Sequence, residues 1–124
     1  MNSTYKLYCV FSRESLKRMN GIRGKMTSQA GHAFLHSFWD ADKRFPFDAD
    51  AYRKSQKSYK ITLVVDTDEE LLSLYEKYKN TCGATKVIDA GLTVFKEPNL
   101  TCVGLGPLNP ETMGQDFKDP KTLA

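Results

Sequence analysis

Segments with the composition of β-strands alternate along this chain with segments whose apolar residues recur every three or four positions. Strand-like runs lie at residues 5–11, 59–65, 85–88 and 101–105. No proline interrupts the helical repeat from Lys25 to about Trp39. A second helix is predicted to begin at Thr67, which acids follow at positions 68–70, and to close at Gly83.

This order of strands and helices constrains the fold. Strands joined through helices run parallel and pack between two helix layers. The last two strands are joined by about a dozen residues without a strong helical pattern, so we expect the final strand to run antiparallel to its predecessor. We therefore predict an α/β fold, a three-layer α/β/α domain with a mixed, mostly parallel four-stranded sheet. The polar stretch 12–24 is expected to be a loop.

Four polar residues from distant parts of the chain meet at one edge of this predicted sheet. Lys25 opens the helix after the first strand, and Asp89 directly follows the third strand. Thr101 begins the last strand, and Thr93 lies in the connection before it. Ligand sites in open α/β sheets form at the carboxyl ends of strands, so this edge is the candidate site.

Lys25 stands where a cation opposes the partial positive charge of a helix start, and Arg23 precedes it. An anion docked there would explain the arrangement, because free backbone N–H groups and the cations would receive it together. A lysine that extends into water explains it equally well. Gln29 and His32 follow at four and seven positions and share the face of Lys25, either to orient a ligand or as a solvated helix face.

A metal site is not expected. His32 and His36 have the spacing of metal ligands, but the sequence offers no third ligand beyond Asp40. The chain also contains no GxSxG, Walker or GxGxxG sequence, which argues against a serine-triad hydrolase and a nucleotide-hydrolysing domain.

The composition is that of an ordinary globular domain, and we expect residues 1–124 to form one domain. Three widely separated cysteines without a CxxC motif indicate buried thiols in a reducing compartment, so we expect a cytoplasmic protein. The apolar run 7–11 is too short for a signal peptide or a membrane span. Residues 1–60 hold 12 Lys and Arg against 5 Asp and Glu. This basic half fits a phosphate-rich partner, unless folding mixes the charges of the two halves.

The spacing of these residues resembles that of a known family. The motifs are Gly24-Lys25-x-x-x-Gln29-x-x-His32-Ala33, Ile88-Asp89-Ala90-Gly91-x-Thr93, and Thr101 with Gly104-x-Gly106-Pro107. Together they resemble the type-2 peptidyl-tRNA hydrolases of archaea and eukaryotes, from about Tyr5 to Pro107. The resemblance implies a cytosolic esterase that frees tRNA from peptides dropped by stalled ribosomes. It also implies a mixed four-stranded sheet with helices on both faces.

The resemblance assigns roles to the candidate residues. It places the family's lysine at Lys25, its aspartate at Asp89 and its two threonines at Thr93 and Thr101. Asp89 would position or deprotonate a water, Lys25 would stabilise the oxyanion, and the threonines would orient the water or the terminal ribose. Residues expected to bind the substrate are Gln29, His32, Arg23 and Arg18, with the arginines on phosphates. This scheme requires no metal and no cofactor.

Two departures from the family pattern leave an alternative open. Leu92 stands where the family usually has a basic residue, and the tail 110–124 lacks the family's usual ending. A member without catalysis that serves as an RNA- or protein-binding module fits these departures. We expect peptidyl-tRNA as the partner and no membrane, and the sequence leaves open whether the protein forms a homodimer.

Overall fold

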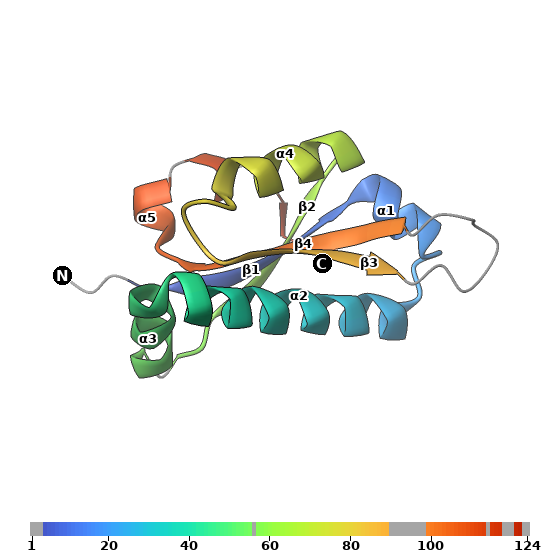
Figure 1. Cartoon of the computed structure of the whole chain (residues 1–124). Helices are drawn as coiled ribbons and strands as arrows, with labels where there is room; N and C mark the ends of the chain where they lie inside the picture. Colours follow the sequence, from blue (N-terminus) through green and yellow to red (C-terminus); the bar gives the residue numbers. More distant parts are fainter. Residues whose placement is uncertain (1–3, 56, 90–98, 114, 118–120, 123–124) are drawn as a thin grey trace.

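The computed structural model describes residues 4–55, 57–89, 99–113, 115–117 and 121–122. Within them five strands form one sheet in the order β3-β4-β1-β2-β5 (Figure 1). The strands are β1 Lys6–Ser12, β2 Lys60–Val65, β3 Ala84–Asp89, β4 Asn99–Leu108 and β5 Lys121–Thr122. The four strands predicted from the sequence are present, and the short β5 adds an edge beside β2.

Helices cover both faces of the sheet, which confirms the α/β class and its three layers (Figure 1). The helices are α1 Arg13–Arg18, α2 Arg23–Arg44, α3 Pro46–Lys54, α4 Asp68–Tyr78 and α5 Pro110–Met113, with a 3-10 turn at Gln115–Phe117. α2 packs on the face that holds Cys9 and Phe11 of β1. α4 packs on the opposite face, against Tyr8 and Val10. Alternate residues of β1 therefore belong to two separate cores, as expected for a strand that is buried on both faces.

The strand pairing corrects the prediction of a mostly parallel sheet. Among the described residues β1 and β2 form the single parallel pair, whereas β4 pairs antiparallel with both β1 and β3. β1, β2 and β3 still run in one direction, but β4 lies between β3 and β1. The predicted antiparallel direction of β4 is confirmed. The position of β4 between β3 and β1 depends on tertiary packing, so the order of elements along the chain does not predict it.

A helix replaces part of the loop predicted for residues 12–24. α1 follows β1 directly, and a capping box closes its start. The Ser15 N–H donates to Ser12 Oγ at 2.9 Å, and the Ser12 N–H donates to Ser15 Oγ at 3.1 Å. The usual box has Glu or Gln at the second position, and serine favours helix interiors only weakly, so the pattern is easily taken for a loop.

α2 rests directly on β4 because the strand has no side chain at Gly104. A Cβ at this position would lie 2.2 Å from the Ala33 carbonyl oxygen, far inside van der Waals contact. Ala33 is itself fully buried. This close approach fixes the height of α2 above the sheet, and with it the positions of the side chains on the first turns of the helix.

The C-terminal segment, which we expected to diverge from the family pattern, packs onto the α4 side of the domain. The ring of Phe117 lies 4.6 Å from that of Tyr8 and 5.1 Å from that of Tyr78, measured between centroids. Lys77 of α4 forms an ion pair with Asp116 at 2.5 Å. β5 then pairs antiparallel with β2.

Candidate active site

α2 and β4 begin where β1 and β3 end, so these four termini share one end of the molecule (Figure 1, right). Lys25 lies in the first turn of α2, and Asp89 is the last residue of β3. Lys25 Nζ is 3.0 Å from Asp89 Oδ2. The shared edge predicted from the topology therefore brings the ammonium group and the carboxylate into direct contact.

The local electrostatics explain why the pair forms at this place. The start of α2 has no side-chain cap and no acid in its first turn, so the positive end of the helix dipole is uncompensated there. Asp89 supplies the negative charge from another element. The side chains of Lys25 and Asp89 are 39% and 28% exposed, so the pair is accessible to a ligand and is screened by water.

Thr101 is placed by a β-bulge rather than by the regular ladder. Val87 pairs with Cys102 and Ile88 pairs with Leu100, so the pairing passes over Thr101. Bulges re-aim side chains and are common beside active sites. The Thr101 hydroxyl turns toward α2, where it lies 3.0 Å from the Val87 carbonyl oxygen and 3.1 Å from Gln29 Oε1.

The contacts of Thr101 define its chemistry. Only 3% of the residue is exposed, so its hydroxyl is occupied by the protein and not by solvent. A hydroxyl has one proton, so it satisfies one of its two acceptors at a time. Gln29 is half-buried and lies one turn after Lys25 on α2. The hydroxyl thus ties the helix that carries Lys25 to the end of β3 that carries Asp89.

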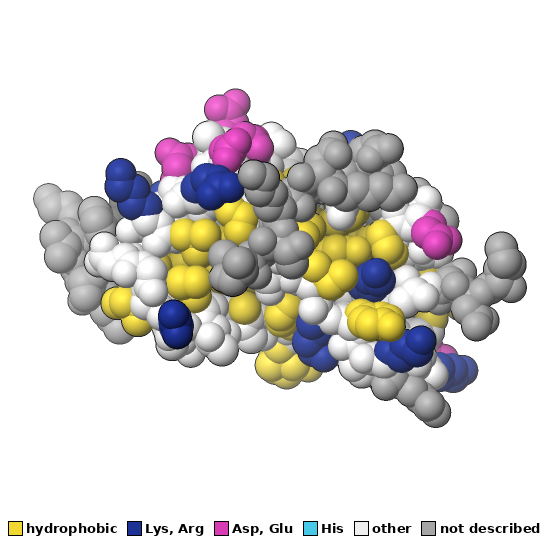
Figure 2. Space-filling view, turned by 180° about the vertical axis from the view of Figure 1, so that it is seen from behind, with side chains coloured by type: hydrophobic (Ala, Val, Ile, Leu, Met, Phe, Trp, Pro, Cys, Tyr) yellow, Lys and Arg dark blue, Asp and Glu magenta, His cyan; other side chains and the backbone are white. Residues whose placement is uncertain are grey.

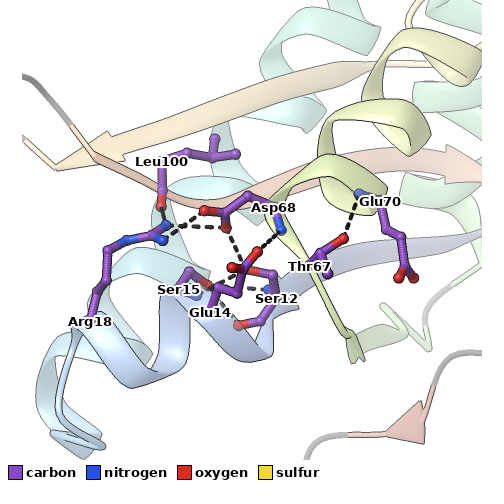
Figure 3. Close-up of polar contacts among 8 residues, drawn as sticks. All are labelled: Ser12, Glu14, Ser15, Arg18, Thr67, Asp68, Glu70 and Leu100. Atoms are coloured by element: carbon purple, nitrogen blue, oxygen red, sulfur yellow. Dashed lines mark hydrogen bonds and ion pairs between the residues drawn. The ribbon is translucent and has the colours of Figure 1, made fainter.

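Arg18 is engaged inside the protein. Its guanidinium binds the Asp68 carboxylate through two nitrogens, at 2.6 and 3.1 Å, and also donates to the Leu100 carbonyl oxygen at 2.7 Å (Figure 3). Ser12 donates to the same carboxylate at 2.6 Å. Burial raises the pKa of the Asp68 carboxyl, but the hydrogen bonds from Arg18 and Ser12 outweigh this effect and lower it. The phosphate contact expected of Arg18 stays a prediction.

The other predicted residues are distributed as follows. Arg23 and His32 are exposed on α2, on the same helix as Lys25 and Gln29. Thr93, and Leu92 beside it, lie outside the described residues. In the part of the chain that the structure describes, no group of three or more His, Cys, Asp or Glu side chains could hold a metal ion.

Sequence reasoning missed the role of Asp68. We took this residue only as one of three acids in the first turn of α4, whereas it also joins α1, α4 and β4 through Arg18. The spacing of acids after Thr67 carries the capping signal alone. The sequence does show two basic residues at 17–18. They lie 50 residues before Asp68, however, and no local pattern indicates that Arg18 would pair with it.

A cavity of about 680 Å³ lies away from this site, between the end of β2 and α4. Its lining includes Asp66, Glu69 and Glu70, and Figure 2 shows acidic side chains gathered over the start of α4. With Asp116, these acids outnumber the two bases of the lining, Arg13 and Lys77, and the net negative charge disfavours a polyanion. The Lys25–Asp89 end of the molecule is therefore the better candidate for a site that acts on a phosphate-rich substrate.

Comparison with known proteins assigns the family. The family described as "Peptidyl-tRNA hydrolase PTH2" matches residues 5–123. A peptidyl-tRNA hydrolase of Methanocaldococcus jannaschii is 36% identical over 68% of this chain and 74% of its own length. One from Methanococcus maripaludis strain C6 is 35% identical over 82% of this chain and 87% of its own. One from Methanopyrus kandleri is 37% identical over 68% and 72%.

None of the helices among the described residues is both long enough and apolar enough to cross a membrane. The match from residue 5 to residue 123 covers both the Lys25 motif of α2 and the Asp89 motif at the end of β3, whose side chains meet in the structure. This chain belongs to the peptidyl-tRNA hydrolase PTH2 family.

Proposed function

We propose that this protein hydrolyses the ester bond of peptidyl-tRNA and releases free tRNA and the peptide. The observation that carries the proposal is the contact between Lys25 and Asp89, whose motifs match the family in sequence. Such a cation and carboxylate, accessible at one end of a sheet, are the groups that ester hydrolysis by water needs. The substrate arises during translation, so we place this activity in the cytoplasm.

Asp89 acts on the attacking water in the proposed mechanism. The carboxylate orients the water and accepts one of its protons as the water oxygen bonds to the ester carbonyl carbon. The bond from this carbon to the ribose oxygen then breaks, and the ribose oxygen takes up the proton that Asp89 had accepted, which restores the carboxylate. The products are a peptide with a free carboxyl group and a tRNA with a free ribose hydroxyl.

Lys25 stabilises the negative charge that develops on the carbonyl oxygen. Its ammonium group has three N–H donors, so it can direct one at Asp89 and another at the oxyanion. The hydrogen bond to Asp89 holds the ammonium in place before the reaction. Gln29, tied to Thr101, keeps the same face of α2 in register with β4.

Arg23 and Thr93 complete the proposed site. Arg23 is exposed at the start of α2, where its guanidinium can reach a substrate phosphate and make binding depend on salt. Thr93 orients the water or the terminal ribose, a role carried over from the family motif. Arg18 adds to phosphate binding only to the extent that its guanidinium can be shared with Asp68.

The test is cleavage of N-acetylated aminoacyl-tRNA by purified protein and by Lys25→Ala and Asp89→Asn variants. We expect each substitution to lower kcat by about 100- to 1,000-fold, the usual cost of removing an oxyanion donor or a general base. Lys54→Ala is the matched control, since Lys54 and Asp50 form a pair of the same length, 3.0 Å, on α3. Circular dichroism checks that each variant is folded.

The outcomes separate the enzyme from a binding module. A wild-type protein that binds tRNA in a salt-dependent way but never cleaves it would support the non-catalytic alternative. Cleavage that survives both substitutions would show that the reaction runs elsewhere on the molecule.

A further inference from the structure

The outer flank of α2 carries a ladder of three neighbouring aromatic rings that the proposed chemistry does not use; the first pair is tilted by 50° and the second is stacked. The rings of His32 and His36 lie 5.5 Å apart, and those of His36 and Trp39 lie 5.3 Å apart with an angle of 17° between their planes. Both histidines are exposed, and Trp39 keeps 54% of its surface exposed. A large aromatic ring at the surface that is stacked rather than buried is available to a ligand.

The ladder continues the row of residues that starts at the candidate site. The residues at 25, 29, 32, 36, 39 and 43 follow one another at steps of four, three, four, three and four, which places them on one flank of the helix. The row begins with Lys25 and ends with Lys43. At 1.5 Å per residue, His32 lies about 10 Å and Trp39 about 21 Å from Lys25 along the helix axis.

The charge of this helix favours a polyanion. From Arg23 to Trp39 it contains two cations, two histidines and no acid. The first acid of α2, Asp40, is held by Arg44 at 2.6 Å and by the Ala84 N–H at 2.9 Å. Asp42, the other acid of α2, pairs with Arg53 at 2.5 Å, so both carboxylates of the helix are engaged by cations and neither is left free beside the ladder.

We propose that the rings of His32, His36 and Trp39 stack with the unpaired bases at the 3′ end of tRNA. This inference rests on the proposed function, because the ester carried by that end must reach Lys25 and Asp89. Aromatic rings beside a cationic backbone track are the usual means of binding single-stranded nucleic acid. Stacked nucleotides rise by about 3.4 Å each, so the distances along α2 span about three to six nucleotides.

A protein partner fits this flank less well. Helices that pack against one another present apolar side chains at alternating steps of three and four. Here those steps hold Lys, Gln, His, His, Trp and Lys. Leu35, the other large apolar residue of α2 that is exposed, is 45% exposed and lies one turn before Trp39. A protein interface would use Leu35, whereas base stacking does not need it.

Trp39 is the single tryptophan of the chain and reports directly on the ladder. The experiment titrates the wild-type protein with a short unacylated RNA that has the sequence of the tRNA 3′ end, and follows tryptophan fluorescence at several salt concentrations. We expect quenching that weakens as salt rises, and much less quenching by a blunt RNA duplex. Equal quenching by the duplex, or none by either RNA, would overturn the proposal.

Variants give the second measurement. We expect Trp39→Ala to lower kcat/KM for N-acetylated aminoacyl-tRNA by about 5- to 150-fold, mainly through KM, as the loss of base stacking predicts. Trp39→Phe, which keeps a ring, should recover most of this loss, and Leu35→Ala should behave as wild type. An equal loss in Leu35→Ala, together with dimers seen by sedimentation in the wild type alone, would instead identify the flank as an interface between copies.

The two proposals fail separately. Fluorescence quenching by RNA in a protein that cleaves no ester would overturn the proposed hydrolysis and leave RNA binding by the ladder intact. Normal cleavage by Trp39→Ala would overturn the proposal that the ladder stacks with tRNA bases, and it would leave the proposed hydrolysis supported.

Discussion

The buried hydroxyl of Thr101 joins the two elements that carry the candidate site, and the catalytic role expected of this residue stays a prediction. Thr101 lies in the bulge of β4, and its hydroxyl contacts Val87 of β3 and Gln29 of α2. These two elements carry Asp89 and Lys25. We therefore expect that removal of the Thr101 hydroxyl changes the distance between Lys25 and Asp89.

We predict that Thr101→Val lowers both stability and activity. Valine has nearly the same shape but removes the one proton that the hydroxyl donates to the Val87 carbonyl oxygen or to Gln29 Oε1, which costs about 1–3 kcal/mol of the free energy of unfolding. Urea denaturation and the tRNA cleavage assay measure the two effects. Thr101→Ser keeps the hydroxyl and should retain most of both, and a valine variant indistinguishable from wild type would refute the role given to the hydroxyl.

At the residue scale, the sequence predicted the contact that the order of elements determines, but it did not predict the partners of individual side chains. Lys25 and Asp89 meet because a helix start and a strand end share one edge of the sheet, which the order of elements determines. The phosphate contact expected of Arg18 stays a prediction, and the sequence did not reveal that Arg18 pairs with Asp68. That choice depends on how α1 turns at the end of β1, which the identity of the residue does not reveal.

At the scale of elements, Asp68 is the point where α1, α4 and β4 are joined. Its carboxylate binds Arg18 and Ser12 and sits in the first turn of α4, where the helix dipole favours a negative charge. Arg18 extends the connection to the backbone of β4 at Leu100. The Asp68 N–H in turn donates to the Glu14 carboxylate of α1 at 2.8 Å.

This connection predicts how stability depends on pH. The pKa of Asp68 is lowered in the folded protein from its ordinary value of 3.8, so the folded state binds its proton less readily than the unfolded chain. Its stabilising effect is full above that ordinary value and is lost as pH falls through the lower folded pKa. Asp68→Asn should remove about 1–3 kcal/mol at neutral pH and flatten the loss of stability at acid pH.

The measurement is thermal or urea unfolding between pH 2 and pH 7, a range that includes the ordinary carboxyl pKa of about 4. Asp66→Asn is the control, because Asp66 and its partner Arg13 are 73% and 58% exposed and such surface pairs contribute little. Parallel pH curves for wild type and Asp68→Asn would contradict the assignment.

Elements were predicted best where an apolar pattern defines them. β2 appears close to its predicted range because a continuous apolar run marks it, and α4 begins where its capping signal predicted. The end of α4 was predicted wrongly, since the helix stops at Tyr78 and not at Gly83. α1 was missed because only Ser12 and Ser15 signal its start. The place of β4 between β3 and β1 was also missed, since strand order depends on which faces the helices cover.

For the molecule as a whole, the three thiols are sealed within the two cores. Cys9, Cys82 and Cys102 are buried, as the wide spacing of the cysteines predicted. Burial raises the pKa of Cys82 to about 12 and raises that of Cys9 well above its ordinary value. The thiolate is the reactive form, so both effects protect these cysteines.

We predict that the folded protein reacts with iodoacetamide at pH 8 at least about 100-fold more slowly than the urea-unfolded chain. Labelling of a buried thiol requires its core to open, and a 100-fold ratio needs an opening free energy of less than about 3 kcal/mol. Mass spectrometry after timed quenching counts the modified thiols. Rapid labelling of any one of the three in the folded state would show that its core opens locally.

The contact between Gly104 and Ala33 has a consequence for anyone who wishes to alter this protein. It contains no charged group, yet it sets how closely the helix bearing Lys25 approaches the sheet. Libraries aimed at new ester substrates should therefore vary the outer flank of the helix and leave this small-residue seam untouched. A catalyst redesigned around a bulkier residue there would have to rebuild its reactive pair from the beginning.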